Sequence, residues 1–180
     1  MISTIRKTAQ AVDIVARLAS IFFVLAVLII MSGQVFFRYV LNSSLQWSEE
    51  ASIWAMIWMV FIGSVVVMRH WDHIYIPTIV RLFPLRIRVW LIVISRVLVG
   101  IFLCVLFWYG WQVVSGSANA YSHNIGVSSA WAKASVPLGA ALMVLMVIAQ
   151  LAEDFAAIIS KDLNRFADFG ATDLPDIPEA

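Results

Sequence analysis

The chain has 180 residues, of which 62% are hydrophobic and 13% are charged, and its formal net charge is +1 at pH 7. With a mean hydropathy of +0.92, it has too little polar surface to cover a water-soluble globule of this length. The composition therefore excludes a soluble domain and predicts a membrane protein.

Four stretches without a charged residue are each long enough to cross a hydrocarbon core, which needs roughly 20 helical residues. They are residues 18–37, 51–68, 97–122 and 134–152. Because these runs are continuously apolar and do not alternate, they predict helices and not the strands of a barrel. We therefore expect an all-α membrane protein with a single domain over residues 1–169, whose helices span about residues 14–38, 48–69, 88–116 and 131–166.

Surface segments are expected outside these four spans. Residues 1–16 mix basic and apolar side chains and suit a short amphipathic helix on the inner leaflet, and residues 71–83 suit a second interfacial helix. The 3.6-residue pattern of apolar positions continues beyond Glu153, so the fourth helix should project from the membrane. Residues 170–180 are acidic and contain proline, which predicts a disordered tail.

Basic residues indicate the orientation of the spans. Ten of the twelve Lys and Arg residues fall in the two termini, in the loop after the second helix and at the start of the third helix, and the other two are Arg38 and Lys133. The positive-inside rule therefore predicts that both termini are cytoplasmic. The first apolar run covers about 20 residues and lacks a small-residue cleavage site, so we interpret it as a retained helix and not as a cleavable signal.

A charged residue inside a span often marks an ion or substrate path, because it is costly in hydrocarbon. Arg96, in the third helix, is the candidate. We interpret it as a side chain that extends along its helix to the cytoplasmic headgroups. The alternative is a buried ion pair with Asp72 or Glu153. Neither arrangement makes a transport site.

Two glutamates, Glu49 and Glu50, start the second helix at the predicted outer interface. Ser48 is a suitable N-cap, which would place both carboxylates in the first turn, near the positive end of the helix dipole. The alternative is that they pair with Arg38 or with a partner protein. Asn42 suits the turn between the first two helices.

No cofactor or metal site is expected in this chain. His70 and His73 follow the second helix, whereas His123 follows the third helix on the opposite side of the membrane. Haem would need two imidazoles that face each other across the helices, and these positions do not provide them. The lone cysteine, Cys104, can form no intrachain disulfide.

Small residues mark the helix faces that we expect to pack tightly, since lipid gives no hydrophobic drive for helix association. The candidates occur in all four helices and are Ser32, Gly33, Gly63, Ser64, Gly100, Gly139, Ala140 and Ala141.

Several short motifs follow one another along the chain. The first hairpin carries Arg38 and Tyr39, then Asn42, then the run Trp47, Ser48, Glu49 and Glu50. The second helix ends in Gly63, Arg69 and the pair His73 and Ile74, and later come Phe83 before Pro84, and Pro137 with Leu138 and Gly139. In this order and spacing, the motifs resemble the small membrane subunit, of the DctQ type, of tripartite ATP-independent periplasmic (TRAP) transporters, over about residues 20–155.

The resemblance implies a non-catalytic scaffold subunit, or stator, with no enzyme activity, in a bacterial inner membrane. A larger membrane subunit would carry the substrate and sodium, and a periplasmic binding protein would capture an organic acid whose identity is not encoded here. Partners would be these two proteins and membrane lipids, with no nucleic acid. The residues with a partner-binding or structural role would be Arg38, Asn42, Trp47, Glu49, Glu50, Gly63, Arg69, His73 and Pro137. Two alternatives stay open: a self-contained small homo-oligomeric channel or exporter, and a membrane anchor for a cytoplasmic enzyme.

Overall fold

The computed structural model describes residues 2–70, 84–122 and 124–159, and its regular elements are helices. They are α1 (Ile2–Tyr39), α2 (Gln46–His70), α4 (Leu85–Gly116), α5 (Ala130–Lys133) and α6 (Ser135–Ile159). Four stretches are long and apolar enough to cross a membrane, namely Thr8–Tyr39, Gln46–Arg69, Ile87–Gly116 and Ala130–Ile159. The expected all-helical fold with four spanning helices is therefore confirmed for the described part of the chain.

The first helix differs from the expectation. Instead of a separate surface helix over residues 1–16, α1 is one uninterrupted helix of 38 residues. The reason is local, because no proline lies in α1 and its first glycine is Gly33, so the sequence offers no residue that breaks the helix before the apolar run. The helix expected at residues 71–83, the continuation of the last helix over residues 160–166 and the tail at 170–180 all lie outside the described residues.

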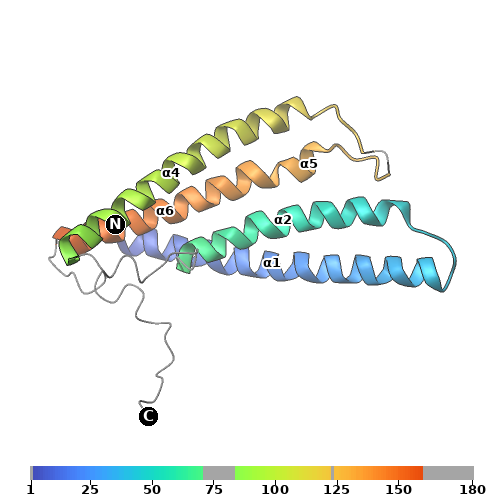
Figure 1. Ribbon diagram of the computed structural model, residues 1–180, viewed down its shortest axis with the longest axis horizontal. Helices are drawn as coiled ribbons and strands as arrows, with labels where there is room; N and C mark the ends of the chain where they lie inside the picture. Colours follow the sequence, from blue (N-terminus) through green and yellow to red (C-terminus); the bar gives the residue numbers. More distant parts are fainter. Residues whose placement is uncertain (1, 71–83, 123, 160–180) are drawn as a thin grey trace, which may run out of the picture.

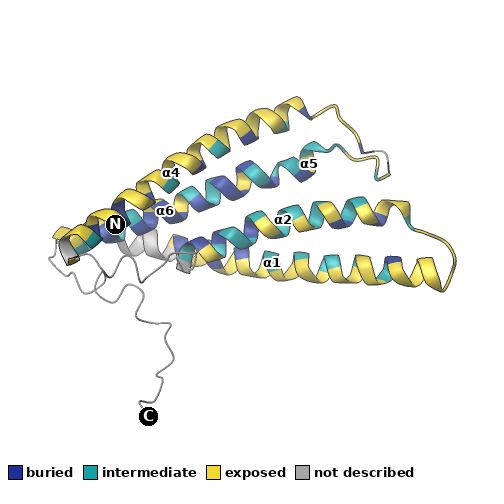
Figure 2. Cartoon of the chain, in the orientation of Figure 1, coloured by how far each residue is buried: buried dark blue, intermediate teal, exposed yellow. Residues whose placement is uncertain are grey.

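The four long helices lie in a row, with α2 between α1 and α6, and α6 between α2 and α4 (Figure 1). They converge at the end that holds the N-terminus of α1 and the C-terminus of α6, and they separate toward the end with the connecting loops. Half of the apolar stretch within the fourth span, Ala130–Ile159, is buried, but only 6% of the apolar stretch within the first span, Thr8–Tyr39 (Figure 2). The outer helices therefore leave most of their apolar surface for lipid or for another protein.

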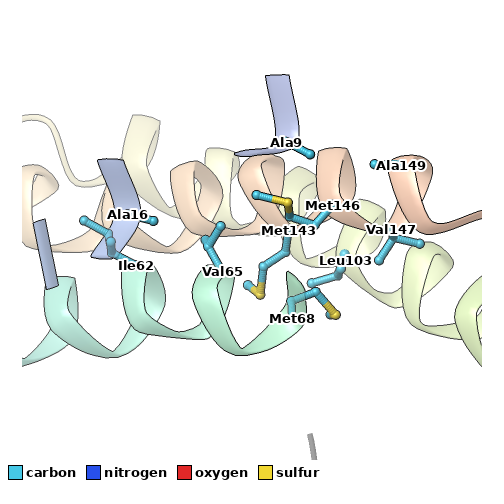
Figure 3. Close-up of a cluster of buried hydrophobic side chains, with 10 residues drawn as sticks. All are labelled: Ala9, Ala16, Ile62, Val65, Met68, Leu103, Met143, Met146, Val147 and Ala149. Carbon is cyan, nitrogen blue, oxygen red and sulfur yellow. The ribbon is translucent and has the colours of Figure 1, made fainter. Parts of the chain in front are cut away.

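The apolar core lies where the helices converge (Figure 3). Val65 of α2 and Met146 of α6 are almost completely enclosed, and they share one cluster with Leu103 of α4 and with Ala9 and Ala16 of α1. The two alanines let α1 approach its neighbours closely, as small residues do between helices in membranes. The core thus ties all four spans together near one end.

A close contact between α2 and α6 depends on a glycine. A Cβ atom at Gly139 would lie 2.8 Å from the Cβ atom of Phe61, which is closer than real Cβ contacts come. At Gly63 the nearest atom would be 3.8 Å away, and at Gly33 no atom would lie within 4 Å. Of these three glycines, only Gly139 is required by the packing within the chain.

Candidate functional site

The connection between α1 and α2 brings together most of the residues that the sequence singled out. Asn42 adopts a positive φ of 51°, a conformation that asparagine tolerates better than most residues. The N–H of Ser43 donates to the carbonyl of Phe37 at 3.1 Å and closes the end of α1. Trp47, at the start of α2, is exposed. The turn role expected for Asn42 agrees with this geometry.

Ser48 does not cap α2, and this expectation is wrong. The helix begins at Gln46, so Ser48 is its third residue, and its buried hydroxyl donates to the carbonyl of Leu45 at 2.6 Å. An N-cap residue stands just before the first helical turn, whereas Ser48 lies inside that turn. Glu49 lies in the first turn, as expected, and Glu50 follows it.

The two glutamates contact different parts of the chain. The side-chain amide of Gln34 on α1 donates to Glu49 Oε1 at 3.1 Å, whereas the hydroxyl of Ser122, in the loop after α4, donates to Glu50 Oε2. Arg38 forms an ion pair with neither, and its guanidinium carbon lies 5.9 Å from the centre of the Tyr39 ring. The hypothesis of an ion pair between Arg38 and these acids is therefore wrong within this chain.

A pocket of about 360 Å³ opens among these groups. Its polar lining comes from four segments: Gln34 and Arg38 of α1, Ser44 of the connection, Gln46 and Glu49 of α2, and Asn124 of the loop between α4 and α5. The pocket therefore gathers one cation, one anion and several amides at the end of the molecule where the helices separate.

A second polar cluster, which sequence reasoning missed, lies where the helices converge. Asp13 of α1 accepts a hydrogen bond from Arg17 at 3.4 Å, and one of its carboxylate oxygens lies 3.9 Å from Nε of Arg69 on α2. The amide of Gln150 on α6 donates to the carbonyls of Met68 and Arg69, at 2.6 and 3.2 Å. Carbonyls at a helix end lack intrahelical partners, so Gln150 satisfies the end of α2 while it joins α2 to α6.

The interpretation of Arg96 is also corrected. Its guanidinium does not extend to the headgroups but forms an ion pair with Asp154 of α6, and both side chains are buried. The expected alternative was a buried pair, but with Asp72 or Glu153. Asp72 lies outside the described residues. The signal for burial was present in the sequence, because Arg96 shares a helical face with Val89, Val93 and Leu103, which are all buried.

The remaining candidates are scattered. Gly63 lies on α2 opposite Ser20, and Pro137 is buried on α6 beside Gly110. Cys104 is exposed on α4, and His73 and His123 lie outside the described residues. Within the described ranges, no group of three or more His, Cys, Asp or Glu side chains is arranged to hold a metal ion.

Comparison with known proteins extends these observations. The chain is 25% identical over 119 residues to a sialic acid TRAP transporter small permease protein, SiaQ, of Vibrio cholerae, which covers 66% of this chain and 69% of that protein. It is 26% identical over 124 residues to a sialic acid TRAP transporter permease protein, SiaT, of Haemophilus influenzae, which covers 69% of this chain but only 20% of that longer protein.

A third relative is a C4-dicarboxylate TRAP transporter small permease protein, DctQ, of Vibrio cholerae, with 27% identity over 82 residues, or 46% of this chain and 35% of that protein. The family described as the DctQ component of tripartite ATP-independent periplasmic transporters matches residues 27–157, which include α2, α4, α5 and nearly all of α6. With four apolar helices over this range and a match to most of its length, the chain belongs to the DctQ family of small TRAP transporter membrane subunits.

Proposed function

We propose that this chain is the non-catalytic scaffold subunit, or stator, of a sodium-coupled TRAP transporter that imports an organic acid. The observation that carries the proposal is the placement of the charge inside the spans. Arg96 and Asp154 neutralise each other between α4 and α6, where both side chains are buried. A pair enclosed in this way joins two helices, whereas a transport site presents its polar groups to a cavity.

A larger membrane subunit is the proposed partner. The match to SiaT of Haemophilus influenzae covers a fifth of that protein, so a segment like this chain occurs there within one longer permease. Segments that occur fused in one protein are good candidates to associate when they are separate. The exposed apolar residues along α1 and α4 offer surface for such a partner and for lipid.

The substrate class and the location are proposed on the same basis. The names of two relatives refer to sialic acid and to C4-dicarboxylates, which are organic acids. We propose that a soluble periplasmic protein captures such an acid, that sodium binds to the large subunit, and that this chain lies in the bacterial inner membrane with both termini cytoplasmic.

Reconstitution tests the proposal. Liposomes that contain this chain alone, the chain with the large subunit, or both with the binding protein should be compared for uptake of radiolabelled sialic acid and succinate. We expect uptake of the cognate acid only with all three proteins, and loss of that uptake when the sodium gradient is removed. Uptake by the isolated chain would instead support the alternative of a self-contained channel or exporter, and full uptake without the chain would overturn the stator role.

A further inference from the structure

The pocket between the first hairpin and the loop after α4 contains a buried acceptor that none of the described residues satisfies. Gln34 is nine-tenths buried, and its amide nitrogen is used in the hydrogen bond to Glu49. Its amide oxygen, Oε1, is buried and accepts no hydrogen bond from the described residues. Buried polar atoms are nearly always hydrogen-bonded, so an orphan acceptor in a polar pocket marks a place for a donor that the described residues do not supply.

Glu49 provides a second acceptor beside the first. Gln34 donates to its Oε1 at 3.1 Å, and the residue is otherwise exposed at the start of α2. A carboxylate has about four acceptor sites, so this single bond leaves capacity for further donors. The two side chains together therefore suit a cationic donor with several N–H groups, as lysine and arginine have.

Arg38 supplies the complementary charge in the same pocket. It forms no ion pair with Glu49 or Glu50, and its guanidinium lies over the Tyr39 ring. A ligand that places a cation at Glu49 and an acidic or carbonyl oxygen near Arg38 would match both charged groups of the pocket. Surface segments of soluble proteins commonly offer such neighbouring groups of opposite charge.

The position of the pocket favours a soluble protein over a lipid. Ser44 precedes α2 and Asn124 lies in the loop between α4 and α5, so part of the lining stands beyond the ends of the helices. These loops lie at the end of the molecule away from the packed core (Figure 1). A ligand that enters past the loops comes from the aqueous side.

We propose that this pocket receives a lysine or arginine side chain of the soluble binding protein, with Gln34 Oε1 and the Glu49 carboxylate as its acceptors. The inference rests on the proposed function, since it requires a TRAP complex in which a soluble protein docks on this subunit. It assigns different roles to the two glutamates, because Glu50 is held by Ser122 and does not line the pocket.

The experiment measures binding of the soluble binding protein to the complex of this chain and the large subunit in nanodiscs. Glu49→Gln removes the charge and keeps the shape, and Gln34→Met removes the acceptor. Glu50→Gln is the matched comparison, because it removes the same charge from the neighbouring residue. We expect Kd to rise about tenfold for Glu49→Gln, equivalent to about 1.4 kcal/mol, severalfold for Gln34→Met, and less than about twofold for Glu50→Gln. The tenfold difference should shrink as salt is raised.

A double-mutant cycle then identifies the docking side chain. Each surface Lys and Arg of the binding protein is replaced by Gln, and one replacement should weaken binding to the wild-type complex but have no further effect on the Glu49→Gln complex. If no basic residue couples to Glu49, or if Glu49→Gln and Glu50→Gln weaken binding equally, the inference is overturned while the proposed function stands. If the wild-type complex binds no soluble protein at all, both are overturned.

A lipid headgroup is tested in the same measurement. Nanodiscs of phosphatidylcholine alone are compared with nanodiscs that contain phosphatidylethanolamine, whose ammonium group could also reach Glu49. An equal rise in Kd for Glu49→Gln in the two kinds of nanodisc supports a protein side chain as the occupant of the pocket. An effect that appears only with phosphatidylethanolamine assigns the pocket to the lipid and overturns the proposal.

Discussion

Arg96 shows how one residue can determine the packing of two spans. Its side chain is 3% exposed and that of Asp154 is 0% exposed, so neither charge is solvated by water or headgroups. Taking two charges out of water is expensive, and their attraction compensates for this cost only while both are present. The pair therefore makes the contact between α4 and α6 depend on each partner.

Replacing Arg96 by Met should destabilise the protein by about 3–5 kcal/mol, because the buried carboxylate of Asp154 loses the opposite charge of Arg96. The double variant Arg96→Met with Asp154→Leu should recover most of this loss, since it removes both charges. Thermal unfolding in detergent, followed by circular dichroism, measures the change.

Arg17→Met is the control for this series. It also breaks an ion pair, with Asp13, but Arg17 is 56% exposed, and such a pair contributes only about 0–1 kcal/mol. Equal losses of stability for the Arg17 and Arg96 variants would show that burial does not govern the energy of the Arg96 pair.

The sequence allowed a buried pair for Arg96 but not the correct partner. Glu153 and Asp154 are adjacent, and both fall on faces of α6 that carry buried residues, so helical periodicity alone does not choose between them. The choice depends on how α6 is rotated against α4, which is a tertiary property. The turn at Asn42 was predictable for the opposite reason, because its conformation is fixed by local backbone chemistry.

At the scale of the elements, the contact between α2 and α6 depends on the missing side chain of Gly139. A methyl group there would meet the Cβ atom and the carbonyl of Phe61, neither of which can rotate away. The contact is therefore limited by backbone positions and not by a flexible side chain.

We expect Gly139→Ala to cost about 1–3 kcal/mol, the usual range for overpacking, and Phe61→Ala should not relieve the loss because alanine retains the Cβ atom. Gly63→Ala is the matched control, since its added carbon would make only an ordinary contact with Ser20 at 3.8 Å. Comparing the midpoints of thermal unfolding of both variants tests this. A Gly139→Ala protein as stable as Gly63→Ala would contradict the observed helix approach.

Helix α2 shows which features of a helix can be predicted from the sequence and which cannot. Its uncharged, apolar run over residues 51–68 predicted the span, because the composition of such a run is a local property of the chain. The closure of its other end by Gln150 was not predictable, since it depends on the approach of α6 to the carbonyls of Met68 and Arg69.

At the scale of the whole molecule, the four spans predict on which side of the membrane each loop lies. After replacement of Cys104 by Ala, single cysteines at Ser44 and Ser122 should react with a membrane-impermeant maleimide added outside intact spheroplasts. Single cysteines at Ser3 and Thr172 should react only after the membrane is permeabilised, because the basic residues favour cytoplasmic termini.

Labelling of each variant in intact spheroplasts should be compared with labelling of the same variant in permeabilised cells, which shows that every introduced cysteine is able to react. Labelling of the Ser3 variant in intact spheroplasts would contradict the orientation.

The unbroken α1 also has a geometric consequence. Its 38 residues extend about 57 Å at 1.5 Å per residue, whereas the hydrocarbon core is about 30 Å thick. Even at a tilt of about 40°, near the upper limit for spanning helices, the core accommodates only about 39 Å of helix. At least about a dozen residues must therefore stand outside the hydrocarbon as a rigid stalk. Because no break separates the stalk from the span, any change in the tilt of α1 swings the stalk and the other end of the helix in opposite directions.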